Sequence, residues 1–202
     1  MLKVGLTGGL ASGKTFVAAV LEQLGCRVVS SDRLGHEAIR RDGESFARVI
    51  EEFGNGILGA DGEIDRSRLG KIVFSDEAKL KKLSSLVHPY VLKKQESIFA
   101  QITAQDSGSI VVCEAAIMIE TGSYSRYDRI VVAVCPPELQ VRRYCAREGV
   151  SMTDALARLA LQIPIEEKRK YADYVIDTAG TKQETKRQVR AVHQELLQQV
   201  VP

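Results

Sequence analysis

The sequence of 202 residues contains no tryptophan and only 5 phenylalanine and 6 tyrosine residues. Lysine and arginine together number 28 against 26 acidic residues, which leaves a formal net charge of only +2. Nucleic-acid-binding proteins typically combine a basic surface with aromatic side chains that stack on bases, and this chain has neither. We therefore expect no nucleic-acid partner, and any attraction for anions must come from a local cluster of residues.

Long hydrophobic runs are absent too. No apolar run approaches the roughly 18 residues that a membrane-spanning helix needs. The chain opens at Met1 directly into a short apolar segment and not into a charged and then apolar signal segment. We therefore expect no membrane partner and a cytoplasmic location.

Cysteine and histidine are also few. The four cysteines lie far apart and form no C-x-x-C pair, and most of them fall in or beside apolar runs, which predicts buried and unreactive thiols. The three histidines have no second type of ligand at a metal-site spacing, so we expect no zinc site.

What the chain does have is an alternation of short apolar runs with helical patterns. Five runs have the length typical of buried strands: Leu2–Leu6, Val28–Val29, Ile110–Cys113, Ile130–Val134 and Tyr174–Ile176. Strands separated by helices predict an α/β fold with a five-stranded parallel sheet.

About eighty residues separate the second apolar run from the third, which is too long for a simple crossover. Their charge and helical pattern predict a helical insertion over one end of the sheet. Within it, an apolar stripe runs from Leu80 to Val87, and we expect Pro89 to interrupt that helix before a second helical stretch begins.

The strongest motif is Gly8-Gly9-Leu10-Ala11-Ser12-Gly13-Lys14-Thr15, which matches G-x-x-x-x-G-K-[ST] and lies between an apolar strand and an amphipathic helix. Glycines let the backbone bend so that several N–H groups point at phosphate oxygens, and the start of the helix adds partial positive charge. Lys14 is expected to reach the β- and γ-phosphates of ATP, and Thr15 to bind Mg²⁺. The residues expected to hold the nucleotide are Gly8, Gly9, Ala11, Ser12, Gly13, Lys14, Thr15 and Phe16.

A phosphate-binding loop alone does not separate kinases from nucleotide-dependent regulatory proteins. Guanine-specific switches usually carry an Asn-Lys-x-Asp element, whereas the only asparagine here is Asn55, which is followed by Gly56. Asp32 falls just past the second apolar run, at the edge of the sheet where ligands bind, so it is a candidate base for an attacking hydroxyl. Its position equally suits a helix cap, and both roles stay open here.

A basic segment follows the fourth apolar run. It predicts a helix that carries Arg142, Arg143 and Arg147, followed by a second helix. Such a cationic pair of helices fits a lid that closes over the transferred phosphoryl group, although a solvated basic face fits the same pattern. The expected helix ends are marked by Pro136, Pro137, Gly149, Ser151 and Asp154.

Over essentially its whole length the sequence resembles the dephospho-coenzyme A kinases. The opening Val4-Gly5-Leu6-Thr7-Gly8-Gly9, together with Gly13-Lys14-Thr15, is similar to the start of that family. More specific elements follow in order: Asp65-Arg66 with Leu69, Val73-Phe74, His88-Pro89, Gln140 with Arg143 and Arg147, Gln162, and Ala172-Asp173-Tyr174-Val175-Ile176.

The resemblance implies transfer of the γ-phosphoryl group of ATP, with Mg²⁺, to the ribose 3′-hydroxyl of dephospho-coenzyme A, the last step of coenzyme A biosynthesis. It implies that Asp32 is the base, that Arg147 and Arg143 bind the phosphates, and that Arg66 and His88 lie on the acceptor side. For His88, a position that breaks the helix ahead of a proline is the alternative. Another small nucleoside or nucleotide kinase, or a nucleotide-dependent regulatory module, remains an alternative for the whole chain.

The resemblance also implies one P-loop kinase unit, residues 1–202, with three parts. These are a nucleotide-binding core at about 1–32, 108–138 and 165–202, a helical insertion for the coenzyme A portion at about 33–107, and a lid at about 139–164. The oligomeric state is left open, because an apolar stripe on a helix serves a core and a subunit interface alike.

Three positions depart from the family pattern. Ser30-Ser31-Asp32 stands where the family usually has Asp-x-Asp. Glu114 stands where the family has a shorter aspartate, so we expect it to support Mg²⁺ indirectly, through a water molecule. Asp177-Thr178 stands where an asparagine often follows the last strand, so no nucleotide-binding residue is assigned there.

Overall fold

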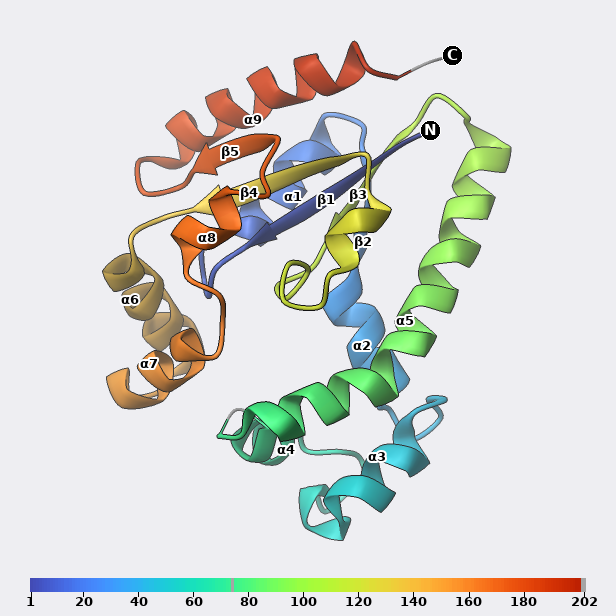
Figure 1. The fold of residues 1–202 in the computed structure, drawn as a ribbon, viewed down its shortest axis with the longest axis vertical. Coiled ribbons are helices and arrows are strands. Elements are labelled where there is room, and N and C mark those ends of the chain that lie inside the picture. Colours follow the sequence, from blue (N-terminus) through green and yellow to red (C-terminus); the bar gives the residue numbers. More distant parts are fainter. Residues whose placement is uncertain (74, 201–202) are drawn as a thin grey trace. The chain divides into compact units, whose positions relative to one another are not determined.

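The computed structural model describes residues 1–73 and 75–200. The chain divides into a first unit, Met1–Ser30 with Phe99–Pro202, and a second unit, Ser31–Ile98 (Figure 1). Phe74, one of the residues of the family resemblance, lies outside the described residues. The division into core, insertion and lid stays a prediction.

A five-stranded parallel sheet is the centre of the first unit. Its strands are β1 (Leu2–Gly8), β2 (Arg27–Ser30), β3 (Ile110–Glu114), β4 (Arg129–Val134) and β5 (Tyr174–Asp177). Their order is β2-β3-β1-β4-β5, and each neighbouring pair is parallel. All five predicted strands and the parallel α/β class are confirmed.

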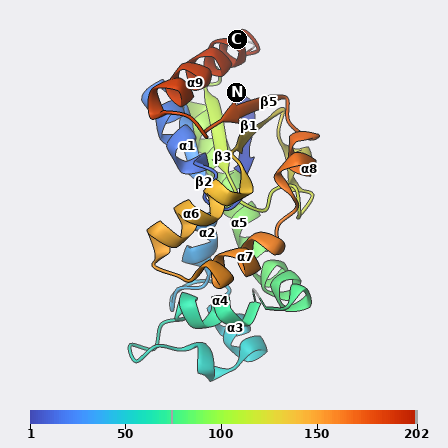
Figure 2. The same ribbon diagram turned by 90° about the vertical axis from the view of Figure 1, so that its left-hand side faces the viewer.

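Helices cover both faces of this sheet (Figure 2). Side chains alternate between the two faces of a strand, and β4 shows this directly. Val131 packs in the same buried cluster as residues of α1 (Lys14–Gln23) and α9 (Lys182–Leu197), whereas Val132 packs with Ile165 of α8 (Ile165–Arg169). The sheet is therefore the middle of three layers.

Two further helices of the first unit, α6 (Pro137–Glu148) and α7 (Met152–Ala160), pack against each other. Gly149 ends α6 with a φ of 66°, and the Ser151 hydroxyl accepts the N–H of Asp154 at the start of α7, as the sequence predicts. A short helix, η2 (Ser123–Arg126), precedes β4.

The second unit is helical and has its own core. Its elements are α2 (Ser31–Ala38), α3 (Phe46–Phe53), η1 (Asn55–Ile57), α4 (Arg66–Val73) and α5 (Glu77–Gln105), whose last turns belong to the first unit. The core is built from aliphatic side chains, namely Ile39, Val49, Ile57, Ile64, Leu69, Val73 and Leu86.

The expected break at Pro89 is wrong, because α5 continues through it as one helix of 29 residues. A proline inside a helix removes one backbone hydrogen bond and crowds the preceding turn. Leu86 and Val91, on either side of Pro89, are 8% and 7% exposed. The burial of both flanking turns therefore outweighs the local cost of the proline.

Across residues 1–73 and 75–200, no helix combines the length and the apolar character that crossing a membrane requires.

Two neighbouring leucines of α9 allow a test of how much the packing of this helix stabilises the first unit. Leu196 is 0% exposed in the main core, whereas Leu197 is 46% exposed. Leu196→Ala should lower the free energy of unfolding by about 2–5 kcal/mol, since it removes buried methylene groups and leaves a cavity. Leu197→Ala should cost less than about 1 kcal/mol. Urea unfolding of both variants checks this, and equal losses would contradict the packing of α9.

Candidate functional site

The loop between β1 and α1 has the backbone that a phosphate-binding turn requires. Gly13, which caps α1, has a φ of 84°, and Ala11 has a φ of 48°. Both values lie in the left-handed region, which is favourable for glycine and costs a residue with a side chain on the order of 1 kcal/mol. A side chain at Gly9 would collide with Gln140 of α6. The loop therefore folds back tightly, and its glycines cannot be replaced without moving its neighbours.

Three predicted site residues meet at the start of α1. Glu114, the last residue of β3, is only 6% exposed. Its Oε1 accepts a hydrogen bond from the Thr15 hydroxyl at 2.6 Å and forms an ion pair with Lys14 Nζ at 3.3 Å. Because β3 and β1 are parallel neighbours, Glu114 lies at the same edge of the sheet as the loop.

These residues fit a magnesium ion that is held mainly by nucleotide phosphates. Mg²⁺ prefers oxygen ligands, and it usually takes one or two from the protein and keeps several waters. Thr15 and Glu114 bring a hydroxyl and a carboxylate oxygen together beside Lys14. Within the described part of the chain, no group of three or more His, Cys, Asp or Glu residues could hold a metal by itself.

The three arginines of α6 have separate surroundings. Arg143 donates to Thr178, from Nη1 to Oγ1 at 3.2 Å and from Nη2 to the carbonyl oxygen at 2.7 Å. Arg147 is exposed and its guanidinium lies 5.6 Å from the centre of the Tyr144 ring. Arg142 is exposed on another side of the helix. The expected contacts of Arg143 and Arg147 with phosphates stay predictions.

In the second unit, the predicted residue Arg66 contacts His36, which lies on the same helix as the predicted residue Asp32. Arg66 donates from Nη1 to Nδ1 of His36 at 2.8 Å, and His36 lies one helical turn after Asp32 on α2. Burial, and then the positive charge of Arg66, lower the pKa of His36, while the negative charge of Asp32 opposes them. These effects favour the neutral form of His36, and its Nδ1 accepts from Arg66 because a guanidinium can only donate.

Two alternatives left open by the sequence are wrong. Asp32 is not the residue that precedes the helix, because α2 begins at Ser31 and Asp32 lies inside its first turn. His88 does not break a helix, because α5 continues past it. His88 is half-buried, and burial lowers its pKa.

Sequence reasoning missed Lys168 of α8, whose side chain is 0% exposed. Its Nζ donates to the carbonyl oxygen of Ala116 at 2.9 Å, forms an ion pair with Glu120 at 2.7 Å, and lies 3.5 Å from the carbonyl oxygen of Gly8. Lys168 therefore joins the end of β1 to the segment that follows β3. No signal marked it, since a lysine among charged neighbours resembles a solvated helix face.

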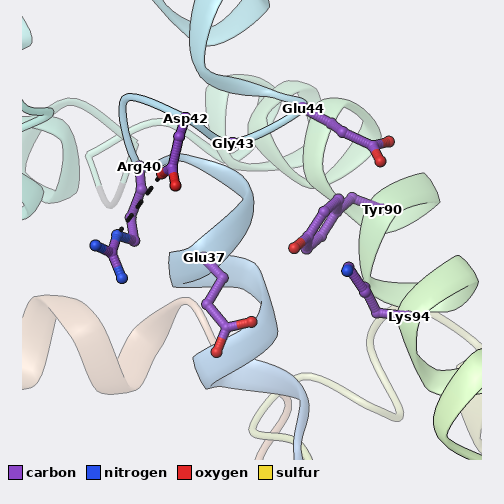
Figure 3. A pocket seen from close by; sticks show the side chains of 7 residues that line it. All are labelled: Glu37, Arg40, Asp42, Gly43, Glu44, Tyr90 and Lys94. Carbon is purple, nitrogen blue, oxygen red and sulfur yellow. Dashed lines mark ion pairs between the residues drawn. The ribbon is translucent and has the colours of Figure 1, made fainter.

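A cavity with a volume of about 360 Å³ lies within the second unit (Figure 3). Figure 3 shows the Arg40–Asp42 ion pair, with a separation of 3.9 Å, and the Lys94 ammonium near the Tyr90 ring at 5.6 Å. Its cations are balanced by carboxylates, so the cavity has no net attraction for phosphate. The residues that line it are Glu37, Arg40, Asp42, Gly43, Glu44, Tyr90 and Lys94.

Comparison with known proteins identifies the family. A family model described as dephospho-CoA kinase matches residues 2–184. The chain belongs to the dephospho-CoA kinase family. The dephospho-CoA kinase of Aquifex aeolicus is 40% identical over 97% of this chain and 98% of its own length.

Solved structures agree with the family. The protein TT1252 of Thermus thermophilus is 33% identical, with a TM-score of 0.76 over 96% of this chain and 97% of its own. The dephospho-CoA kinase of Campylobacter jejuni is 27% identical, with a TM-score of 0.67 over 98% of both chains. The P-loop kinase fold expected from the sequence is confirmed.

The buried ion pair of Lys168 provides a test of stability. Lys168→Met should lower the free energy of unfolding by about 3–5 kcal/mol, because it leaves Glu120 as an uncompensated buried charge. Adding Glu120→Leu should recover part of that loss, since the charge is then removed as well. Denaturant unfolding of both variants measures this.

The control is Lys170→Met. Lys170 pairs with Glu167 at the surface, where the two side chains are 67% and 51% exposed, so its loss should cost less than about 1 kcal/mol. A Lys168→Met variant as stable as Lys170→Met would contradict the structural role of Lys168.

Proposed function

We propose that this chain transfers the γ-phosphoryl group of ATP to the ribose 3′-hydroxyl of dephospho-CoA, giving CoA and ADP. Membership in the dephospho-CoA kinase family supports this, because the family match covers residues 2–184. The structural observation that carries it is the start of α1, where Lys14 and Thr15 both contact the buried carboxylate of Glu114.

Lys14 and the start of α1 supply part of the proposed charge stabilisation, together with Mg²⁺ and Arg147. During transfer, negative charge spreads over the oxygens of the γ-phosphoryl group, and little covalent chemistry is left for the protein to do. Lys14 places an ammonium group there, and the first N–H groups of α1 add partial positive charge. Glu114 holds Lys14 at 3.3 Å, so the ammonium does not have to be ordered when ATP binds.

Thr15 and Glu114 are the proposed magnesium-binding residues. When bound, Mg²⁺ neutralises charge on the β- and γ-phosphates. Glu114 accepts from Thr15 at 2.6 Å, and this hydrogen bond leaves the lone pairs of the Thr15 oxygen available to an ion. The carboxylate would support the ion through a bound water molecule.

Asp32 is the proposed general base. It accepts the proton of the 3′-hydroxyl while the bond from that oxygen to the γ-phosphorus forms and the bond to the leaving ADP oxygen breaks. Arg66, oriented by neutral His36, and His88 are the proposed contacts of the acceptor. Arg147 is the proposed lid contact with the transferred group.

An acceptor panel tests the substrate. ADP release with Mg-ATP should be stimulated by dephospho-CoA and not by adenosine, AMP, CMP or shikimate. If another acceptor alone stimulates ADP release, dephospho-CoA is not the substrate, although the chain is still a kinase. Absence of stimulation by every acceptor would contradict the kinase reaction and favour a regulatory module.

Asp32→Asn tests the base. The amide keeps the shape of the side chain but cannot take the proton, so kcat should fall by roughly 10²-fold or more while the affinity for ATP is kept. Asp42→Asn is the control, because Asp42 is 87% exposed, and it should keep the wild-type kcat. If Asp32→Asn retains kcat within a few-fold, another group must take the proton.

Glu114→Gln tests the magnesium assignment. The amide removes the negative charge, so the Mg²⁺ concentration required for half-maximal activity should rise by about 10–100-fold, as for other supporting ligands of metal sites. The exposed Glu22→Gln, at the far end of α1, is the matched control. An unchanged Mg²⁺ dependence in Glu114→Gln, measured at fixed ATP, would remove Glu114 from the metal site.

A further inference from the structure

Thr178 connects the phosphate-binding loop to the sheet. It directly follows β5 and is only 4% exposed. Its hydroxyl lies 2.6 Å from the carbonyl oxygen of Ser12 and 3.1 Å from that of Val134, the last residue of β4. The N–H of Thr178 also donates to Val134, at 2.9 Å. The backbone of Thr178 is therefore held by β4, and its side chain extends to the phosphate-binding loop.

Arg143 determines which way the Thr178 hydroxyl faces. Its Nη1 lies 3.2 Å from Oγ1 of Thr178, and its Nη2 donates to the Thr178 carbonyl at 2.7 Å. A guanidinium can only donate, so it occupies a lone pair of the hydroxyl oxygen. The hydroxyl hydrogen is left to point at the carbonyls, and the shorter contact is the one to Ser12.

Holding the Ser12 carbonyl fixes the next N–H as well. The peptide bond between Ser12 and Gly13 is planar and trans, so the Gly13 N–H points away from Thr178. Gly13 also packs closely on this side chain, because a Cβ placed on it would lie 3.2–3.3 Å from three atoms of Thr178. In this motif, the N–H groups of the loop are the ones that point at phosphate oxygens.

We propose that Thr178 is a positioning residue for nucleotide binding: its hydroxyl, oriented by Arg143, holds the Ser12–Gly13 peptide so that the Gly13 N–H is presented to the phosphates of ATP. The inference rests on the proposed function for the identity of the ligand. It gives Arg143 a role that acts through Thr178, in place of the direct phosphate contact expected from the resemblance.

Calorimetric titration of the full chain with ADP and with a non-hydrolysable ATP analogue tests the proposal without turnover. Thr178→Val keeps the shape but loses the hydroxyl, so the Kd should rise on the order of 10-fold. Thr178→Ser keeps the hydroxyl and should bind within about 2-fold of the wild type. In steady-state kinetics, Thr178→Val should raise the KM for ATP and leave the KM for dephospho-CoA unchanged.

A double-mutant cycle tests the path through Arg143. Arg143→Met alone should weaken nucleotide binding about as much as Thr178→Val, and the double variant should bind no more weakly than either single variant, because both changes disrupt the same chain of contacts from Arg143 through the Thr178 hydroxyl to Ser12. If the increases in Kd of the two single variants multiply in the double variant, the proposed route through Thr178 is overturned, and Arg143 contacts the nucleotide directly.

Further outcomes separate the two proposals. Thr178→Ala is a second variant without the hydroxyl, and circular dichroism and urea unfolding confirm that each variant is folded. Wild-type affinity in both the Val and Ala variants would overturn the inference alone. A wild-type chain that binds neither ADP nor the ATP analogue would overturn the proposed function, and the inference with it.

Discussion

A loop that turns its N–H groups toward an anion must turn the matching carbonyls toward the protein, because each peptide unit is planar. Carbonyls in a buried layer need donors, and leaving one without a partner costs about 1–3 kcal/mol. Here the Ser12 carbonyl receives the hydroxyl of Thr178, and the Gly8 carbonyl lies within 3.5 Å of the Lys168 ammonium. The Gly13 carbonyl is satisfied by the first turn of α1 itself. The site therefore depends on residues from the last quarter of the chain, far from the motif.

Two lysine–glutamate pairs flank this loop and have different tasks. Lys168 directs its ammonium at backbone oxygens and at Glu120, and it is fully buried, so it holds segments together. Lys14 is 14% exposed, and its partner Glu114 also accepts from a hydroxyl, so this pair can exchange partners when an anion arrives. In both pairs the carboxylate offsets the cost of taking a lysine out of water. The two pairs differ in their surroundings, because the ammonium group of Lys168 also contacts backbone carbonyl oxygens, whereas that of Lys14 is partly exposed.

The sequence predicts the parts of this structure that local pattern controls. The five strands, the glycine turn and the start of α7 each depend on a few neighbouring residues, and all are confirmed. The structural role of Lys168 cannot be predicted from local pattern, because its burial depends on Gly8, Ala116 and Glu120, which are distant in the sequence. The predicted break at Pro89 is wrong for a related reason, since the packing of the turns on either side of it outweighs a local preference. The roles of the site residues remain predictions where they require a bound substrate.

The residues proposed to bind the acceptor include a neutral side chain that orients a charged one. Dephospho-CoA is anionic, so the positive charge of a side chain that binds it must not be neutralised by an ion pair with a nearby carboxylate. Arg66 gives one of its five N–H groups to His36, which orients the guanidinium without neutralising it. This holds only while His36 is uncharged, and burial together with Arg66 keeps its pKa low against the opposing charge of Asp32. The imidazole thus contacts the proposed substrate-binding cation and lies one helical turn from the proposed base, and in its neutral form it does not add to or cancel the positive charge of Arg66.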